Sequence, residues 1–221
     1  MAGWVTAGCI ILNAIVPELV ERGQKVAQLK KTKCLTNGKK KAKDNDMLTA
    51  MGDVMRRAYE KGWITTRDGN ISLRRRGKKM MYITPSGWRK TIIHPEHMLK
   101  IVFNHQACRV VGNSDAKPSG ELEMHYLLQR DYKPTRAIVH LHPTNIIAAI
   151  FAGWDLQKLA DNFPEVSRYT MVGPTVPVLP VTSAELAVAT YDAMTVHGKV
   201  VYDIVGQAAH GVCAIGDNPW D

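Results

Sequence analysis

The sequence predicts an α/β fold in which helices cover a largely antiparallel or mixed sheet. From residue 46 onwards, short strand candidates arrive in pairs between helical stretches, whereas a parallel sheet requires strands and helices to alternate one by one. The length of 221 residues is enough for one well-buried domain with an appendage, and the 45% apolar and 22% charged residues are ordinary for a globular protein. Collagen-like and wholly disordered chains are therefore excluded.

The appendage comprises residues 1–45, and the domain is expected over residues 46–221. An apolar run from Gly3 to Val16 lacks the basic flank of a signal peptide, and it is shorter than the roughly twenty residues that a membrane span needs. Apolar residues at helical spacing predict a helix over residues 5–29, which is expected to pack on the domain or on a neighbouring subunit. Residues 30–45 are then a linker.

The positive charge of the chain is concentrated in the same appendage. Residues 1–46 carry nine of the 29 Lys and Arg residues against four acidic residues, so the rest of the chain is only mildly basic. A lysine cluster without interleaved arginine or aromatic residues offers neither bidentate phosphate contacts nor stacking platforms, which argues against nucleic acid as a partner. The four cysteines are widely spaced and form no C-x-x-C pair, so we expect a reducing, cytoplasmic location.

The first half of the domain is expected to contain one helix and four short strands. Asn45 or Asp46 can cap a helix that ends at Gly62. Its apolar stripe consists of Met47, Leu48, Met51, Met55 and Tyr59. Runs of strand-forming residues follow, separated by glycine and proline turns, at 71–74, 80–84, 99–103 and 108–111.

The second half of the domain alternates helices with further strands. Ser119 is expected to begin a helix to about residue 130, and Pro143 to begin another after a strand at 137–142. A short helix is expected after Asp155, and a capping-box pattern at 182–185 predicts a helix to about residue 194. The remaining strands are expected at 170–179, where one or two fit, and at 199–204 and 212–215.

Two histidines at the end of one predicted strand are the strongest chemical signal. Alternate residues of a strand point to the same face, so His140 and His142 can direct two imidazoles at one metal ion. By itself, such a pair is structural about as often as it binds a metal. His210, at the start of another predicted strand, is a candidate third ligand, and three histidines with an open fourth position are typical of a catalytic zinc site.

A carboxylate and several glycine turns lie at other strand and helix ends. Pro118-Ser119-Gly120-Glu121 places a carboxylate in the first turn of a helix, beside backbone N–H groups that attract an anion such as a phosphate. Asp68-Gly69-Asn70-Ile71-Ser72 and Thr84-Pro85-Ser86-Gly87 are turns in which glycine lets the backbone approach a ligand oxygen closely. Taken singly, each of these segments is equally an ordinary cap or turn.

Taken in order, these segments resemble the class II aldolase/adducin family over about residues 46–217. The motifs that carry the resemblance are G-N-I-S (69–72), T-P-S-G (84–87), P-S-G-E-L-E-M-H (118–125), H-L-H-P-T-N (140–145) and A-H-G-V (209–212). Within the family, the sequences around the histidines are most similar to those of rhamnulose-1-phosphate and fuculose-1-phosphate aldolases.

The resemblance implies a three-layer α/β/α fold with a mostly antiparallel central sheet and a homotetramer with sites at subunit boundaries. It implies a zinc-dependent lyase that cleaves a ketose 1-phosphate reversibly to dihydroxyacetone phosphate and an aldehyde, the metal stabilising the enediolate. One Zn2+ per subunit, or another divalent metal, would be bound by His140, His142 and His210, and Glu121 would be the general acid/base. The substrate phosphate would be surrounded by Gly69, Asn70, Ser86, Gly87, Ser119 and Gly120.

Other reactions of the same family remain open at this point. A glutamate at position 121 favours an aldolase over a 4-epimerase, because the family's epimerases carry an aspartate at the matching place. A sugar-phosphate dehydratase or decarboxylase would use the same histidines and glutamate. A non-catalytic, adducin-like interaction module is the alternative of another class, although a scaffold has no need of this constellation.

Overall fold

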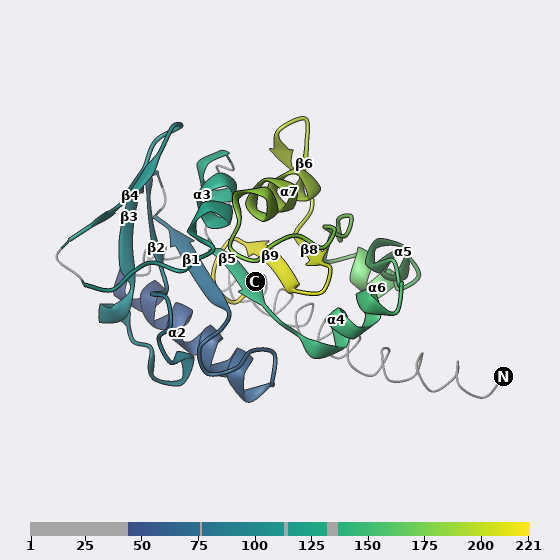
Figure 1. Ribbon diagram of the computed structural model, residues 1–221, viewed down its shortest axis with the longest axis horizontal. Coiled ribbons are helices and arrows are strands. Elements are labelled where there is room, and N and C mark those ends of the chain that lie inside the picture. The colour runs from purple at the N-terminus through teal and green to yellow at the C-terminus, as the bar shows by residue number, and fades with distance from the viewer. Residues whose placement is uncertain (1–43, 76, 113–114, 132–136) are drawn as a thin grey trace, which may run out of the picture.

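The computed structural model describes residues 44–221 apart from 76, 113–114 and 132–136. In this part of the chain a seven-stranded sheet lies between two layers of helices (Figure 1). The three-layer α/β/α architecture is therefore confirmed. The predicted N-terminal helix and nearly all of the predicted linker lie outside the described residues. Among the described helices, none combines the length and the apolar character that a membrane crossing requires.

The central sheet is antiparallel in each of its ladders, as the paired strands predict. Its spatial order is β4-β3-β2-β1-β5-β9-β8. The strands are β1 (Asn70–Arg74), β2 (Met80–Ile83), β3 (Leu99–Phe103), β4 (Cys108–Val111), β5 (Ala137–Leu141), β8 (Ile204–Gln207) and β9 (Gly211–Gly216). The central strand β5 lies between β1 and β9, with His140 opposite Asn70 on one side and Cys213 on the other. This register brings three separate parts of the sequence to one end of β5.

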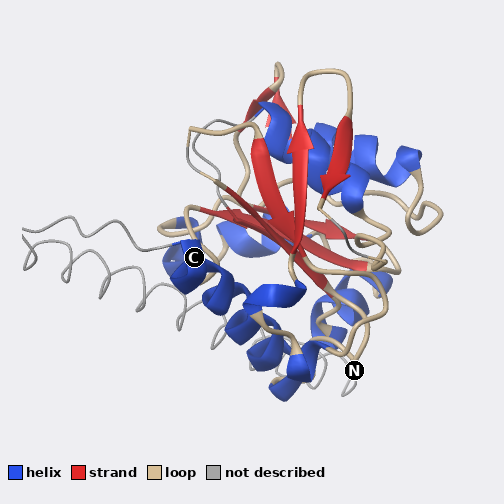
Figure 2. Ribbon diagram, turned by 90° about the vertical axis from the view of Figure 1, so that its left-hand side faces the viewer, coloured by secondary structure: helices blue, strands red, loops and turns tan. Residues whose placement is uncertain are grey.

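Helices cover both faces of the sheet, as Figure 2 shows from the side. One face carries α3 (Leu122–Asp131) and α7 (Ala184–Met194), which pack on each other. The other face carries α2 (Asp44–Glu60) and α4 (Thr144–Phe151), with α5 (Leu156–Asp161) and α6 (Pro164–Ser167) beside them. Two short 3-10 helices, η1 (Lys90–Ile92) and η2 (Pro95–His97), follow β2, and β6 (Thr195–Val196) pairs with β7 (Lys199–Val200) in a small hairpin.

Strand alternation divides the apolar core into two layers. On β5, Ile138 packs into the cluster under α3 and α7, whereas Ala137 and Val139 pack towards α2. The α2 side is filled by Met51 and Met55, both fully buried. Because His140 is two residues beyond Ile138, it shares the α3 side of the sheet.

Side chains cap two of the predicted helices, whereas Asn45 and Asp46, the caps expected for the first helix, lie inside α2. The Asp155 side chain accepts hydrogen bonds from two backbone N–H groups at the start of α5. The Ser183 hydroxyl accepts the backbone N–H of Leu186, at 3.1 Å, at the start of α7. Each cap satisfies a helix N–H that would otherwise lack a partner.

Two strand predictions are corrected by longer-range contacts. Residues 170–179 form no regular strand, only isolated parallel bridges from Val172 and Val176 to β8. Prolines at 174, 177 and 180 lack the N–H groups that a continuous ladder needs. The predicted strand at 199–204 divides into β7 and β8, because the N–H of Val201 turns to the carbonyl of Met194.

Two helix predictions also need correction. Tyr59 is 39% exposed, whereas Ala58 is buried, because positions 51, 55 and 58 follow the helical repeat and position 59 turns away from it. The helix expected from Ser119 begins at Leu122. Ser119 instead donates its N–H to the carbonyl of Thr84, at 3.2 Å, and so belongs to an extended pairing.

Candidate metal centre

The end of β5 carries the first two histidines of the site. His140 is 1% exposed, and His142 follows the strand directly on the same side of the sheet. Their Nε2 atoms lie 2.9 Å apart, and their ring centroids are separated by 4.7 Å. The strand period therefore brings the two imidazoles together.

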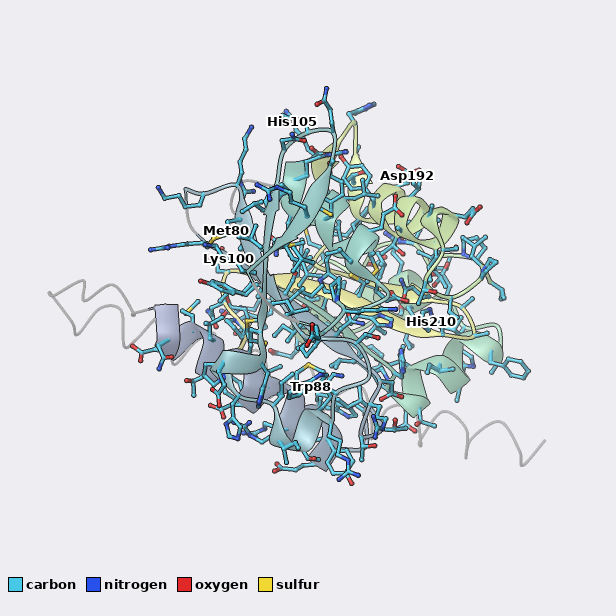
Figure 3. All side chains as sticks on the ribbon, turned by 60° about the vertical axis from the view of Figure 1, so that its left-hand side comes forward. Met80, Trp88, Lys100, His105, Asp192 and His210 are labelled. Atoms are coloured by element: carbon cyan, nitrogen blue, oxygen red, sulfur yellow. The ribbon has the colours of Figure 1, made fainter. Side chains whose placement is uncertain are left out.

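His210 reaches these two rings from the turn between β8 and β9, at one end of the yellow β9 ribbon in Figure 3. Its ring centroid lies 4.8 Å from that of His140 and 5.1 Å from that of His142. One nitrogen from each of the three rings lies within 4.8 Å of the others. Gly211 permits this approach, because a Cβ there would lie 2.7 Å from Cδ2 of His142.

Hydrogen bonds on the outer ring nitrogens aim the inner ones at each other. Nδ1 of His140 lies 3.0 Å from the carbonyl oxygen of Val212, and Nδ1 of His142 lies 3.2 Å from Oδ2 of Asp68. Carbonyl and carboxylate oxygens accept hydrogen bonds, so each Nδ1 donates and each Nε2 presents a lone pair. Burial, together with the neighbouring histidines, holds the pKa of His140 well below its usual range. This imidazole is therefore neutral, as a metal ligand must be.

His210 differs from the other two histidines in its outer nitrogen. Its Nδ1 is buried and has no hydrogen-bond partner among the described residues. Burial, and secondarily the nearby His142, lower the pKa of its ring. The ring is thus neutral, but within the described part of the chain no hydrogen bond to Nδ1 fixes its orientation.

Glu121 faces the three histidines from the turn before α3. The residue is 7% exposed, with Oε2 3.9 Å from Nε2 of His140 and Oε1 3.8 Å from Nε2 of His210. Oε2 is buried without a hydrogen-bond partner in the described part of the chain. Burial raises the pKa of this carboxyl group, and the backbone of Thr182 partly opposes that shift.

These donors fit a divalent cation such as zinc. Neutral imidazole nitrogens and carboxylate oxygens are ordinary zinc ligands. Two facing lone pairs at 2.9 Å repel each other, and a buried carboxylate oxygen without a hydrogen-bond partner in the described chain is costly, so a cation would stabilise the cluster. His140, His142 and His210 could therefore hold a metal, with Glu121 beside it.

Two of the predicted phosphate loops lie next to each other near this cluster. Pro85 and Pro118 form an antiparallel bridge. The N–H of Ser86 donates to the carbonyl of Lys117, at 2.8 Å. Ser86, Gly87 and Gly120 are exposed, whereas Ser119 is buried and accepts the N–H of Glu121 at 3.2 Å.

Asn70 and Gly69 lie in the packing of the site rather than on its surface. Oδ1 of Asn70 lies 2.5 Å from Nε2 of the fully buried His125, whose Nδ1 lies 2.7 Å from the hydroxyl of Ser72. Burial lowers the pKa of His125 to about 3, so this ring is a neutral structural link. Gly69 has a φ of +66°, and a Cβ there would lie 3.3 Å from the carbonyl oxygen of His140.

Tertiary contacts also explain the glycine at position 120. A Cβ on Gly120 would lie 2.8 Å from Cγ2 of Thr182, a residue with a φ of +58°. Thr182 and Asp68 were not predicted as site residues. Asp68 was visible only as part of a turn motif, and no local signal connects it with His142, 74 positions away.

An apolar groove of about 230 Å3 lies apart from this chemistry. It is lined by residues of α2, α4 and the sheet, including Val54, Ile146 and Val139. None of the predicted site residues lines it. The groove is therefore distinct from the candidate metal centre.

Comparisons with known proteins agree with this architecture. Residues 49–221 match the family described as the Class II Aldolase and Adducin N-terminal domain. The chain is 28% identical over 180 residues to a 5-deoxy-D-ribulose 1-phosphate aldolase from Bacillus thuringiensis serovar kurstaki, which corresponds to 80% of this chain and 76% of that protein. The crystal structure of l-fuculose-1-phosphate aldolase from Thermus thermophilus has a TM-score of 0.62 and 25% identity, covering 78% of this chain and 80% of its own.

A third similarity covers less of the relative. The chain is 26% identical over 113 residues to a methylthioribulose-1-phosphate dehydratase from Danio rerio, which is 51% of this chain and 46% of the dehydratase. The match therefore spans about half the length of that protein.

Proposed function

Because the chain belongs to the class II aldolase and adducin family, we propose that it is a zinc-dependent lyase that reversibly cleaves a ketose 1-phosphate into dihydroxyacetone phosphate and an aldehyde. The observation that carries this proposal is the convergence of three imidazoles beside a buried carboxylate oxygen that has no hydrogen-bond partner among the described residues. Similarity to the 5-deoxy-D-ribulose 1-phosphate aldolase over 76% of its length supports the reaction class.

The three histidines would hold one zinc ion, or another divalent cation, per subunit. Bound there, the metal would supply Lewis-acid stabilisation of the negative charge that develops on the substrate oxygens. The protein's contribution is to keep His140 and His210 neutral and to orient His140 and His142. Burial suppresses protonation of His140, and Val212 and Asp68 determine which nitrogens of His140 and His142 are free.

Glu121 is the residue proposed to move the proton. Its Oε2 has no hydrogen-bond partner in the described chain, so it is available to take a proton from the carbon beside the substrate carbonyl and to return it. Burial raises the pKa of its carboxyl group, which brings it closer to the pH at which a general base works best. The hydroxyl of Ser119 holds the backbone of Glu121 in place.

The substrate phosphate is proposed to bind across the paired loops at 84–87 and 117–120. Ser86 and Gly87 are exposed there, and the bridge between Pro85 and Pro118 keeps the two loops together. The Ser119 hydroxyl can still donate a hydrogen bond while it accepts one. Gly69 and Asn70, also expected near the phosphate, are buried beside the carbonyl oxygen of His140 and the ring of His125 respectively.

We also propose that the enzyme is a cytoplasmic homotetramer with its sites at subunit boundaries. The support is the set of motifs that resembles the family's sugar-phosphate aldolases. Cys108 and Cys213 are free thiols, which suits a reducing compartment. Sedimentation equilibrium of the full chain tests the assembly.

The test of the reaction is C–H exchange of dihydroxyacetone phosphate in D2O, followed by NMR with the zinc-loaded protein. Exchange requires only that a proton leave the carbon beside the carbonyl, so the aldehyde need not be known. We expect exchange by the wild type, its loss on chelation, and a fall of about 10²–10⁴-fold in Glu121→Gln. The matched control is Glu123→Gln, an exposed carboxylate two positions along the chain. A protein that holds zinc and causes no exchange would contradict the aldolase assignment.

A dehydratase is the second candidate function, and the similarity to methylthioribulose-1-phosphate dehydratases is the observation that favours it. The same carboxylate would then remove a proton before water leaves. Incubation with methylthioribulose 1-phosphate distinguishes the two reactions, because a dehydratase forms a product without releasing dihydroxyacetone phosphate. Decarboxylase and 4-epimerase activities are tested in the same way, with sugar-acid and pentulose phosphates.

A non-catalytic interaction module predicts a different metal result. Such a protein would purify without stoichiometric zinc, and His142→Ala would change nothing in its metal content. The proposed enzyme predicts the opposite outcome in both measurements.

A further inference from the structure

The segment before β1 contacts both the metal centre and a neighbouring loop. Within it, Asp68 uses both oxygens of its carboxylate. Oδ1 accepts the backbone N–H of Thr65, and Oδ2 accepts the Nδ1 proton of His142. The first hydrogen bond lies within the turn itself and sets the direction of the carboxylate. The second hydrogen bond then orients the imidazole of His142.

A buried lysine holds the same segment from the other side. Lys90 is 1% exposed, and its ammonium donates hydrogen bonds to the carbonyl oxygens of Arg67, at 3.1 Å, and Trp88, at 3.0 Å. The backbone N–H of Lys90 donates to the carbonyl of Thr66, at 2.7 Å. The Arg67 side chain in turn donates to the carbonyl of Gly87, at 2.6 Å. These contacts fasten residues 65–68 to residues 87–90.

A charged group at this buried position is energetically unfavourable unless hydrogen bonds or an ion pair compensate its desolvation. Burial lowers the pKa of Lys90 to about 8, while the nearby charge of Asp68 raises it and that of Arg67 lowers it. A methionine would fill a similar volume without the desolvation penalty. What a methionine could not do is bind two main-chain carbonyls from different loops. The charge is therefore explained by the joining of these loops.

The two joined loops serve different parts of the site. One carries Asp68, which contacts His142, and leads into Gly69 and Asn70 at the start of β1. The other follows Ser86 and Gly87, at the proposed phosphate position. Trp88, on this second loop, is labelled in Figure 3. Because the loops are held together, the distance between the metal centre and the proposed phosphate position is also fixed.

We propose that Lys90 and Asp68 are positioning residues of the metal centre: Lys90 clamps residues 65–68 against the loop at 87–90, and Asp68 then holds the imidazole of His142 with Nε2 towards the metal. This inference rests on the proposed function, since it requires a metal at the histidine cluster. A carboxylate on the outer nitrogen of a histidine ligand fixes the ring and increases its basicity.

The first test is the zinc affinity of Asp68→Asn, measured by competition with a chromophoric chelator. The amide keeps the shape of the side chain and removes its charge, and the side chain is partly exposed, so the variant is expected to fold. We expect affinity to fall about 10–100-fold, while Asp161→Asn, an exposed carboxylate on α5, binds like the wild type. An Asp68→Asn protein with wild-type affinity would overturn the role of Asp68.

The second test asks whether Lys90 acts through Asp68. Lys90→Met is expected to weaken zinc binding by less than the roughly 10–100-fold expected for Asp68→Asn, because the clamp is one contact further from the metal. The control is Lys61→Met, an exposed lysine. In the double variant Asp68→Asn/Lys90→Met, the affinity should equal that of Asp68→Asn alone. Additive losses would separate Lys90 from Asp68 and overturn the link.

A second readout separates positioning from general loss of structure. In the zinc-loaded wild type, the Nδ1 proton of His142 should give a protected signal in a long-range 15N–1H spectrum, and this signal should shift in both single variants. Unfolding temperatures of the two controls and the two variants are recorded alongside. If the wild type itself binds no zinc, the proposed function fails in that measurement. If the wild type binds zinc and neither variant changes affinity or signal, only the positioning inference fails.

Discussion

The candidate site has two ends that differ in structure: a metal end at the histidine cluster and a phosphate end at the loops 84–87 and 117–120. The metal end consists of buried and half-buried side chains at neighbouring strand ends and in the turn before α3, with His140 fixed by the register of β5 against β9. The phosphate end consists of exposed loop segments whose backbone groups and hydroxyls are joined by the bridge from Pro85 to Pro118. In the proposed site, strand ends would hold the metal ligands rigidly, and the exposed loops would bind the substrate phosphate.

The largest effect is expected at the metal end. His142→Ala should abolish stoichiometric zinc, with a loss of affinity beyond the roughly 10–100-fold that removal of an outer hydrogen-bond partner costs. The fold should persist, because the ring of His142 is half-buried at the end of β5. Metal analysis of the purified protein measures this. His105→Ala is the control, since His105, labelled in Figure 3, lies in the exposed turn between β3 and β4. If His142→Ala still bound one zinc per chain, His142 would not be a required metal ligand.

The buried His125 should make the free energy of unfolding depend on pH. His125 contacts Asn70 and Ser72, and burial lowers its pKa to about 3 from 6.5. Between these values the unfolded chain binds more protons than the folded one, so stability is full above about pH 6.5 and falls as the pH drops towards 3. At about 1.4 kcal/mol per pKa unit, the loss approaches about 5 kcal/mol.

The measurement is the free energy of unfolding of the wild type and His125→Gln from pH 7 to pH 4. Glutamine keeps donor and acceptor capacity but does not titrate in this range. The variant should therefore lose part of the acid sensitivity. Parallel curves for the two proteins would contradict a neutral, buried His125.

At the phosphate end, single changes should have moderate effects. Ser86→Ala is expected to raise the KM for dihydroxyacetone phosphate about tenfold, the effect of one hydrogen bond to a charged group, with little change in kcat. Unphosphorylated dihydroxyacetone should react equally with the wild type and the variant. Ser119→Ala should also lower kcat, because its hydroxyl holds the N–H of Glu121. An unchanged KM in both variants would contradict phosphate binding at these loops.

The smallest effect concerns the fit between the loops and α7. Gly120→Ala places a Cβ 2.8 Å from Cγ2 of Thr182, which should lower the free energy of unfolding by about 1–3 kcal/mol. The double variant Gly120→Ala/Thr182→Ser removes the opposing methyl group and should regain part of the loss. Urea denaturation of the three proteins checks this, and no regain would indicate that the strain lies elsewhere.

The sequence by itself determined the features that depend on local periodicity. The period of two along a strand brings His140 and His142 to one face, and the short paired strands correctly predict an antiparallel sheet. Helix caps at Asp155 and Ser183 satisfy donors within their own turn. Such contacts join residues two to four positions apart, so the sequence contains all that they need.

Only the tertiary structure decided what lies around those local features. Asp68 meets His142 across 74 positions, and Lys90 joins two loops through main-chain carbonyls that no side-chain pattern reveals. The predicted strand at 170–179 forms only two isolated bridges to β8. Prolines at 174, 177 and 180 lack the N–H groups that continuous pairing with β8 requires. These outcomes depend on which distant segments come into contact, and that is set by packing of the whole chain.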